Sequence, residues 1–407
     1  MDSETLHVPA HVPRARIVDL DVYALPGADA DFLMAWKAVQ DTAPSSLVWT
    51  PHNAGHWIAT RGPEIAAAYT DHESFSSRAV LVPRDRAEAF QVKPTTLDPP
   101  VHTPYRRLIN AALTPAIVEA TRPFIREAAE AAIARVAPDG RCEFIREVAA
   151  TIPLAIFMQM AGLPLADMDR LPRYNEPLID ADGNETNADI MTRFANYLRP
   201  HCAARLARPG EDFLSRIICG EVDGKPLSED DAVDMATTMM TGGIDTVIST
   251  LGLLMAHLAR DPALRARLAA TPDLIPVAVR EMLRRYPIMT KARLVTRQTV
   301  LDGVTLAPGE MVVLPPLHGL DERLFDDPLT VDIDRPTRPN LSFGVGVHRC
   351  PGMLLALAEI ETVLTTWLER IPDFGIDPAC PPRTQGGVLG AVQQLGLVWT
   401  PAGAPPA

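Results

Sequence analysis

The chain has 407 residues, of which 47% are hydrophobic and 22% charged, a composition typical of a globular protein with a large core. Its formal net charge of -13 argues against nucleic acid or an anionic membrane as the main partner. The first twenty residues contain no apolar run that could serve as a signal peptide or membrane anchor. We therefore expect a cytoplasmic monomer with no membrane or nucleic-acid partner.

The cysteines argue against a zinc ribbon and against a disulfide scaffold. There are five of them, an odd number, they are widely spread, and no two form a CxxC pair: Cys142, Cys202, Cys219, Cys350 and Cys380. A reduced protein with structural thiols is the simplest interpretation, and we adopt it for all of them except Cys350.

The first half of the chain favours helices after one pair of strands. Residues 47–60 predict two short strands around a turn, and residues 104–270 are mainly helical in pattern. Within them, residues 114–140 predict a helix that Pro123 breaks and the sequence PDG ends. Residues 171–195 are more polar, and DADGN at 180–184 predicts a mobile surface loop.

The second half contains the strongest helix, from an N-cap at Ser228 to about Arg260, apolar on most sides and therefore expected to cross the core. Residues 273–287 predict a further helix stopped by Pro287, residues 293–315 alternate like paired strands, and residues 353–371 are helical again. No linker or repeat interrupts the chain. We predict one mainly α domain over residues 1–407, with small β-sheets.

The segment SFGVGVHRCPG at residues 342–352 raises the question of whether Cys350 is a metal ligand, a nucleophile or a buried thiol. A thiolate needs nearby N–H groups, a helix N-terminus or positive charge. Glycines precede Cys350, a helix follows it, and Arg349 adjoins it. Taken alone, a cysteine before a helix is more often structural. A nucleotide loop is excluded because no GxGxxG or GxxxxGK[ST] follows a strand here.

The whole segment resembles the haem-binding signature of the cytochrome P-450 monooxygenases: Phe343, Gly344, a second glycine, His348, Cys350 and a final glycine. The resemblance implies haem b as cofactor, with Cys350 as the thiolate ligand of the iron. It further implies that Phe343 packs against the haem and the sulfur.

Other segments agree with this resemblance. TGGIDT at residues 241–246 resembles the family's oxygen-activation segment. There a glycine pair weakens the helix, Thr246 bonds a backbone carbonyl to open a groove for dioxygen, and Asp245 delivers protons. Standing alone, Thr246 would be read as a core threonine.

Two further sets of residues match the family. Glu281 and Arg284 resemble its buried ExxR pair, joined by Arg335, with a role in folding around the haem. The expected partners of the haem propionates are His102, Arg106, Arg293 and His348.

The likeness extends over nearly the whole chain to the bacterial camphor hydroxylases, in HWIATRG, HESFSSR, LVPRDRAEAF and HGLDER among others. It implies electrons from a two-iron ferredoxin and its flavin-dependent NAD(P)H reductase, both separate proteins. The arginines expected to dock the ferredoxin are Arg106, Arg107 and Arg349.

Departures from the camphor hydroxylases concern the substrate. Phe90 stands where they place a tyrosine that donates to the substrate ketone, and Leu81 and Val92 stand where they have larger aromatics. The rest of the expected pocket is Thr95, Thr238, Thr241, Met289, Val388 and Leu389. We therefore expect a terpenoid or norisoprenoid ketone larger than camphor, such as an ionone, with a threonine as its polar contact.

Three more departures concern the haem and the proton path. Lys291 replaces an aspartate beside a propionate and can add a positive partner. Pro351 follows the thiolate and has no N–H to offer the sulfur. Asp180 stands where a basic residue usually pairs with the acid of the oxygen-activation segment, and Arg173 is the nearest basic candidate.

Two alternatives stay open for the activity. A peroxide-driven haem-thiolate peroxygenase is disfavoured because such proteins usually lack the Asp–Thr pair that this chain keeps. A non-catalytic haem sensor would have no oxygen-activation groove and would typically carry a second, signalling domain.

Overall fold

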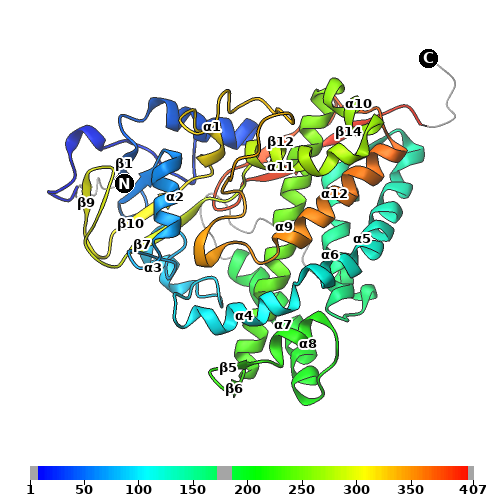
Figure 1. Cartoon of the computed structure of the whole chain (residues 1–407), viewed down its shortest axis with the longest axis horizontal. Helices are drawn as coiled ribbons and strands as arrows, with labels where there is room; N and C mark the ends of the chain where they lie inside the picture. Colours follow the sequence, from blue (N-terminus) through cyan, green and yellow to red (C-terminus); the bar gives the residue numbers. More distant parts are fainter. Residues whose placement is uncertain (1–7, 172–185, 402–407) are drawn as a thin grey trace.

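The structure, a computed structural model, describes residues 8–171 and 186–401, with the side chains of residues 186–190 excepted. The strands of the largest sheet lie on one side of the molecule and most helices on the other, with the longest helix, α9 (Glu229–Arg260), running through the middle (Figure 1). The mainly α fold expected from the sequence is confirmed.

The other α-helices surround α9. They are α1 (Ala28–Thr42), α2 (Gly62–Thr70), α3 (Arg84–Ala89), α4 (His102–Ala112), α5 (Pro115–Val136), α6 (Thr151–Met160), α7 (Thr186–Ala207), α8 (Phe213–Ile218), α10 (Pro262–Ala270), α11 (Ile275–Arg285) and α12 (Met353–Arg370).

The largest sheet has five strands in the order β1-β2-β10-β7-β3, and the β10–β7 and β1–β2 pairs are antiparallel. A second sheet has the order β11-β14-β4, and three hairpins pair β12 with β13, β5 with β6 and β8 with β9. The strands are β1 (Leu47–Thr50), β2 (His56–Ala59), β3 (Phe75–Ser76), β4 (Arg141–Glu143), β5 (Glu221–Val222), β6 (Lys225–Pro226), β7 (Lys291–Val295), β8 (Thr299–Leu301), β9 (Val304–Leu306), β10 (Met311–Leu314), β11 (Gly375–Ile376), β12 (Arg383–Gln385), β13 (Ala391–Gln394) and β14 (Gly396–Val398).

Most expected elements are present, and one expectation was wrong. Helix α5 does not break at Pro123 but continues through it to Val136. Proline removes one N–H donor from a helix, and contact with α12 and α6 along its length stabilises α5 in spite of that loss. Helix α11 ends at Arg285, two residues before Pro287. The DADGN segment, Arg173 and Asp180 lie outside the described residues.

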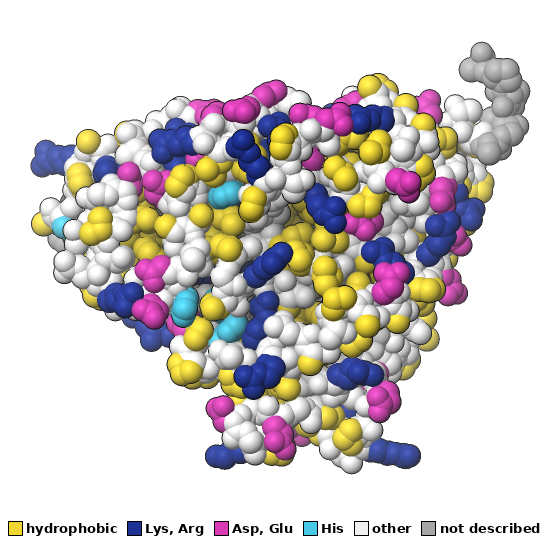
Figure 2. All heavy atoms as spheres, in the orientation of Figure 1, with side chains coloured by type: hydrophobic (Ala, Val, Ile, Leu, Met, Phe, Trp, Pro, Cys, Tyr) yellow, Lys and Arg dark blue, Asp and Glu magenta, His cyan; other side chains and the backbone are white. Residues whose placement is uncertain are grey.

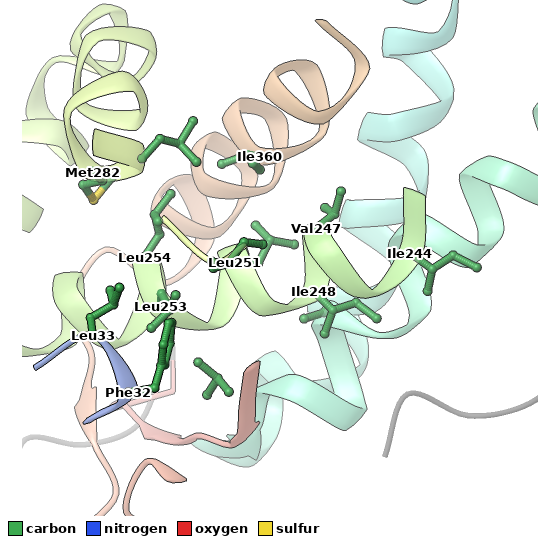
Figure 3. Close-up of a cluster of buried hydrophobic side chains, with 14 of the residues drawn as sticks. Phe32, Leu33, Ile244, Val247, Ile248, Leu251, Leu253, Leu254, Met282 and Ile360 are labelled. Carbon is green, nitrogen blue, oxygen red and sulfur yellow. The ribbon is translucent and has the colours of Figure 1, made fainter. Parts of the chain in front are cut away.

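Helix α9 forms the centre of the core. The Ser228 hydroxyl oxygen accepts a hydrogen bond from the N–H of Asp231 at 3.1 Å, which caps the helix as expected. Figure 3 shows its apolar side chains pointing outward in several directions, toward Phe32 on α1, Met282 on α11 and Ile360 on α12. Within the described ranges α9 alone is long and apolar enough to cross a membrane, but most of it is buried inside the protein, as in a core helix.

A glycine sets how closely α9 packs against its neighbours. A β carbon at Gly252 would lie 2.7 Å from the side chain of Ile145 and 2.9 Å from that of Val392. Such distances are far below van der Waals contact, so only glycine lets α9 lie directly against β13 and the turn at residues 145–149.

A buried ionic network holds α11 against the chain segment that leads toward Cys350. Arg284 donates two hydrogen bonds of 2.8 Å to the Glu281 carboxylate, and Arg335 donates one of 3.3 Å to the same group. Arg284 also donates to the carbonyls of Gly319 and Pro328. The pair is buried, with Arg284 2% and Glu281 9% exposed.

Replacing Arg284 by methionine should strongly destabilise the protein, because the Glu281 carboxylate would stay buried without its main partner. Loss of one member of a buried pair typically costs about 3–5 kcal/mol. The exposed Arg267–Asp334 pair provides the control, so Arg267→Met should change the melting temperature little. Comparable melting temperatures for the two variants would contradict a structural role for the network.

Candidate active site

One cavity of about 330 Å³ lies between α9, β7 and the loop before α12, and many of the residues singled out by the sequence line it. Among them are Thr95, His102, Arg106, Thr238, Thr246, Met289, Arg293, Phe343, Gly344, His348 and Cys350. These residues come from segments spread over most of the chain. The fold therefore brings together what the sequence leaves far apart.

The loop before α12 presents Cys350 to the cavity. The N–H of Cys350 donates to the carbonyl of Phe343 at 2.8 Å, and the N–H of Gly344 donates to the carbonyl of Leu341 at 2.8 Å. Gly344 and Gly346 have φ of +67° and +73°, and a β carbon at Gly346 would lie 3.1 Å from the carbonyl oxygen of Tyr69. The positive φ favours glycine at both positions, and at Gly346 the carbonyl of Tyr69 also leaves little space for a side chain.

The environment of the Cys350 thiol has opposing effects on its pKa. Burial raises the pKa, while the N–H of Gly352 and the charges of Arg106, Arg349 and Lys291 lower it, and burial prevails. The protein alone therefore does not make a thiolate at neutral pH. The glycines, the helix and Arg349 around Cys350 in the sequence had suggested that it would. A bound metal ion would, since coordination displaces the thiol proton. Of the five cysteines, all within the described ranges, Cys350 alone lines the cavity.

One end of the cavity is lined by nitrogen donors that have no acceptor within the described part of the chain. The rings of His102 and His348 lie 4.4 Å apart, and the Nε2 atom of each is buried without a hydrogen-bond partner. Burial, with help from Arg293, lowers the pKa of His348 to about 3, and burial also lowers that of His102, so both rings are neutral. Arg293 is buried as well, stacked 5.0 Å from the ring of Tyr69. Such a set of donors fits an anion.

Helix α9 borders the cavity at the segment TGGIDT. The Thr246 hydroxyl donates to the carbonyl of Gly242 at 2.8 Å, the expected bond back along the helix. The helix nevertheless runs unbroken through this segment. Gly242 and Gly243 both line the cavity, and a β carbon on either would meet no atom within 4 Å. Their contribution is therefore open space beside Thr246 rather than an interruption of the helix.

Asp245 adjoins this open space in sequence but is not part of the cavity lining. Burial raises its pKa to about 7, and no ion pair to it is formed within residues 8–171 and 186–401. Its carboxyl group is thus close to half protonated at neutral pH, which is the condition under which an acid can donate and recover a proton.

The expected substrate residues divide into two groups. Thr95, Thr238 and Met289 line the cavity, whereas six others do not in this conformation: Leu81, Phe90, Val92, Thr241, Val388 and Leu389. Phe90 is 37% exposed, among the most exposed large apolar residues described. Met289 and Leu389 form an isolated antiparallel β-bridge, so Leu389, of the second group, lies next to a residue of the lining.

Two parts of the lining were not anticipated from the sequence. Helix α6 contributes Ile156, Phe157 and Met160, whose helical spacing alone does not distinguish a cavity wall from core. Glu359 on α12 also lines the cavity; burial raises its pKa to about 8, and its Oε2 atom has no partner. A signal for Glu359 was present, namely an acid within the apolar run MLLALAEIETVL.

Comparison with known proteins identifies the family. Residues 273–377 match the family model described as Cytochrome P450. Cyclomarin C epoxidase CymV of Salinispora arenicola is 33% identical over 77% of this chain and 83% of its own length. Steroid C26-monooxygenase of Mycobacterium tuberculosis is 30% identical over 81% of this chain and 91% of its own length.

Solved structures agree over almost the full length. The crystal structure of CYP101J2 is 38% identical with a TM-score of 0.88, covering 97% of this chain and 99% of its own. The crystal structure of CYP101C1 is 36% identical with a TM-score of 0.90, covering 97% of this chain and 100% of its own. The resemblance to the camphor-hydroxylase-like class is thereby confirmed. The chain belongs to the cytochrome P450 family, the monooxygenases whose haem is held by a cysteine thiolate.

Proposed function

We propose that this protein hydroxylates a small apolar terpenoid or norisoprenoid ketone, ionone-like rather than camphor, with Cys350 as the iron ligand. We assign residues 1–407 to one haem-thiolate domain and place the protein in the cytoplasm. The observation that carries the proposal is that Cys350 and Thr246 line one cavity together with His102 and His348, whose buried Nε2 atoms have no hydrogen-bond partner in the described structure.

The residues present fit haem. Its two propionates would supply the acceptors that the buried Nε2 atoms of His102 and His348 lack, and Arg106 and Arg293 would add positive charge beside them. Phe343 and Leu355 give the cavity apolar surface near Cys350. Haem, when bound, supplies the iron at which dioxygen is activated.

Two residues of α9, Thr246 and Asp245, would then take part in proton transfer. Because the hydroxyl proton of Thr246 is held by the carbonyl of Gly242, its oxygen is left free to accept a hydrogen bond from a group in the cavity. Asp245, with a pKa raised to about 7 by burial, can release and recover a proton at neutral pH.

Polar contact with the substrate falls to Thr95. Thr238 uses its hydroxyl proton to bond the carbonyl of Asp234 at 2.9 Å. The Thr95 hydroxyl lines the cavity without a hydrogen bond to any described residue. A ketone oxygen would therefore find its donor at Thr95, in place of the tyrosine that Phe90 replaces.

The electron donor we propose is a two-iron ferredoxin with its flavin-dependent reductase. Arg107 and Arg349 are exposed, and Arg106, the neighbour of Arg107 on α4, donates to the carbonyl of Arg349 beside Cys350. Figure 2 shows basic side chains gathered over α4 and the loop before α12, around a hollow in the surface. An acidic ferredoxin would fit this face despite the negative total charge.

The thiolate is tested by the spectrum of the reduced protein with carbon monoxide. We expect the red-shifted Soret band of a thiolate-bound haem, and its loss in Cys350→His. The matched control is Cys219→Ser, which should leave the spectrum unchanged. A Cys350→His variant with the wild-type spectrum would assign the ligand elsewhere. Turnover with ferredoxin and reductase, compared with peroxide alone, separates a monooxygenase from a peroxygenase.

Spin-state titration tests the substrate. We expect β-ionone to shift the haem toward high spin more completely than camphor, because Phe90 cannot donate the hydrogen bond that the tyrosine of the camphor hydroxylases gives to the camphor ketone. A full shift with camphor at micromolar affinity, and none with ionones, would reject the proposed substrate class.

Thr95→Val supplies the matched test of the polar contact. Loss of one hydrogen bond of about 1 kcal/mol should weaken ketone binding roughly fivefold. Binding of the corresponding hydrocarbon should not change, and Thr95→Ser should behave as the wild type. Equal weakening for ketone and hydrocarbon would indicate a packing effect instead.

Asp245→Asn should uncouple electron consumption from product formation, with a loss of product rate on the order of a hundredfold. In the wild type, coupling should fall as the pH rises through about 7, since an acid with a raised pKa holds its proton below that value and loses it above. The variant should show no such pH response. Asp230→Asn, at the exposed start of the same helix, is the control. Normal coupling in Asp245→Asn would remove Asp245 from the proton path.

Pro351→Leu should raise the haem reduction potential. It restores an N–H beside the sulfur, which in the wild type receives a backbone hydrogen bond from Gly352. A further donor withdraws charge from the thiolate and so favours the reduced iron. Redox titration monitored by absorbance measures the effect, and an unchanged or lower potential would count against it.

A further inference from the structure

Among the lysines that are not exposed, Lys291 alone has no carboxylate beside it in the described residues. Of the four lysines, Lys37 pairs with Asp41 and Glu322, Lys93 pairs with Asp231, and Lys225 is exposed. Within residues 8–171 and 186–401, no ion pair or hydrogen bond reaches the Lys291 ammonium. Lys291 is half-buried and lines the cavity.

The strand places a second cation next to it. Lys291 and Arg293 stand two residues apart on β7, and alternate residues of a strand point to the same face. Both line the cavity. Burial, followed by the charge of Arg293, lowers the pKa of Lys291 to about 8, and burial also lowers that of Arg293. Two enclosed cations side by side are unfavourable unless an anion lies between them.

The position of Lys291 favours the haem over the substrate as the source of this anion. Its charge is felt by the Cys350 thiol, and Arg293 is its other electrostatic neighbour. Arg293 in turn lowers the pKa of His348, whose Nε2 atom lacks an acceptor. Lys291 therefore belongs to the donor-rich end of the cavity. It shows no such coupling to Asp234, whose carbonyl accepts from the substrate residue Thr238.

We propose that Lys291 binds a haem propionate and, as a third cation of the cavity lining beside Arg106 and Arg293, favours reduction of the iron. This inference rests on the proposed function. A ferric porphyrin core carries one positive charge, the thiolate and two propionates carry three negative charges, and the three side chains carry three positive charges. The site therefore has one surplus positive charge before it accepts an electron and none afterwards. Without Lys291 it would be neutral when oxidised and negative when reduced.

The test compares purified holoproteins of Lys291→Met, Lys291→Gln and Lys291→Arg with the wild type. The first two should have a lower reduction potential and should lose haem to excess apomyoglobin roughly tenfold faster or more, as expected for loss of a charge-assisted hydrogen bond. Lys291→Arg keeps the charge and should retain most of both properties. Lys225→Met removes the same charge from the exposed hairpin β5–β6 and should change neither.

Three outcomes would overturn the inference. The first is that Lys291→Met and Lys291→Gln leave both the reduction potential and the rate of haem loss unchanged. The second is that Lys291→Arg changes the potential and the rate of haem loss as much as Lys291→Met does, which would indicate packing rather than charge. The third is that a carboxylate-bearing terpenoid no longer shifts the spin state of the haem in Lys291→Met while the reduction potential stays constant. Lys291 would then bind the substrate rather than the haem. Failure of the proposed function is recognised separately, because the wild type would then lack the thiolate–carbon monoxide band.

Discussion

The placement of the loop that carries Cys350 depends on the Glu281 carboxylate, which is buried between Arg284 and Arg335. It accepts hydrogen bonds from both guanidinium groups and from the N–H of Asp332. The same helix α11 reaches the loop directly, since the hydroxyl of Ser342 donates to the carbonyl of Leu283 at 2.6 Å. A β carbon at Gly319 would lie 2.1 Å from the carbonyl oxygen of Arg284, so even the turn at residues 318–320 is fitted to this helix. The loop that carries Cys350 is thereby held by α11 at one end and continues into α12 at the other.

Exclusion of water sets the chemistry of the cavity. Desolvation is the leading cause of the pKa shifts of Asp245, Glu359, His348 and Cys350, and in each case it favours the uncharged form. Asp245 is therefore about half protonated and Glu359 mostly protonated near neutral pH, while the ring of His348 is neutral. Permanent positive charge in the lining comes from arginines and Lys291, which gather at the donor-rich end. The cavity is thus divided between an end suited to carboxylates and apolar walls suited to hydrocarbon.

Much of this could be predicted from the sequence, because local rules determine it. The cap at Ser228, the glycines around Cys350 and the Arg284 pair each depend on residues close together in the chain. Long-range packing decides the rest. Nothing local shows that α5 survives Pro123, that Phe90 is exposed, or that Ile156 and Phe157 on α6 form a cavity wall. Helical spacing gives the face that is buried but not what it is buried against.

Under the proposed ligation, burial of Cys350 also governs the chain before it receives haem. The raised pKa keeps its sulfur protonated at neutral pH, and a protonated thiol is a poor nucleophile and oxidises slowly. Iron then takes the place of that proton, so haem uptake releases one proton and becomes more favourable as the pH rises. The same dry surroundings that suit the finished site would thus protect its ligand from oxidation during assembly.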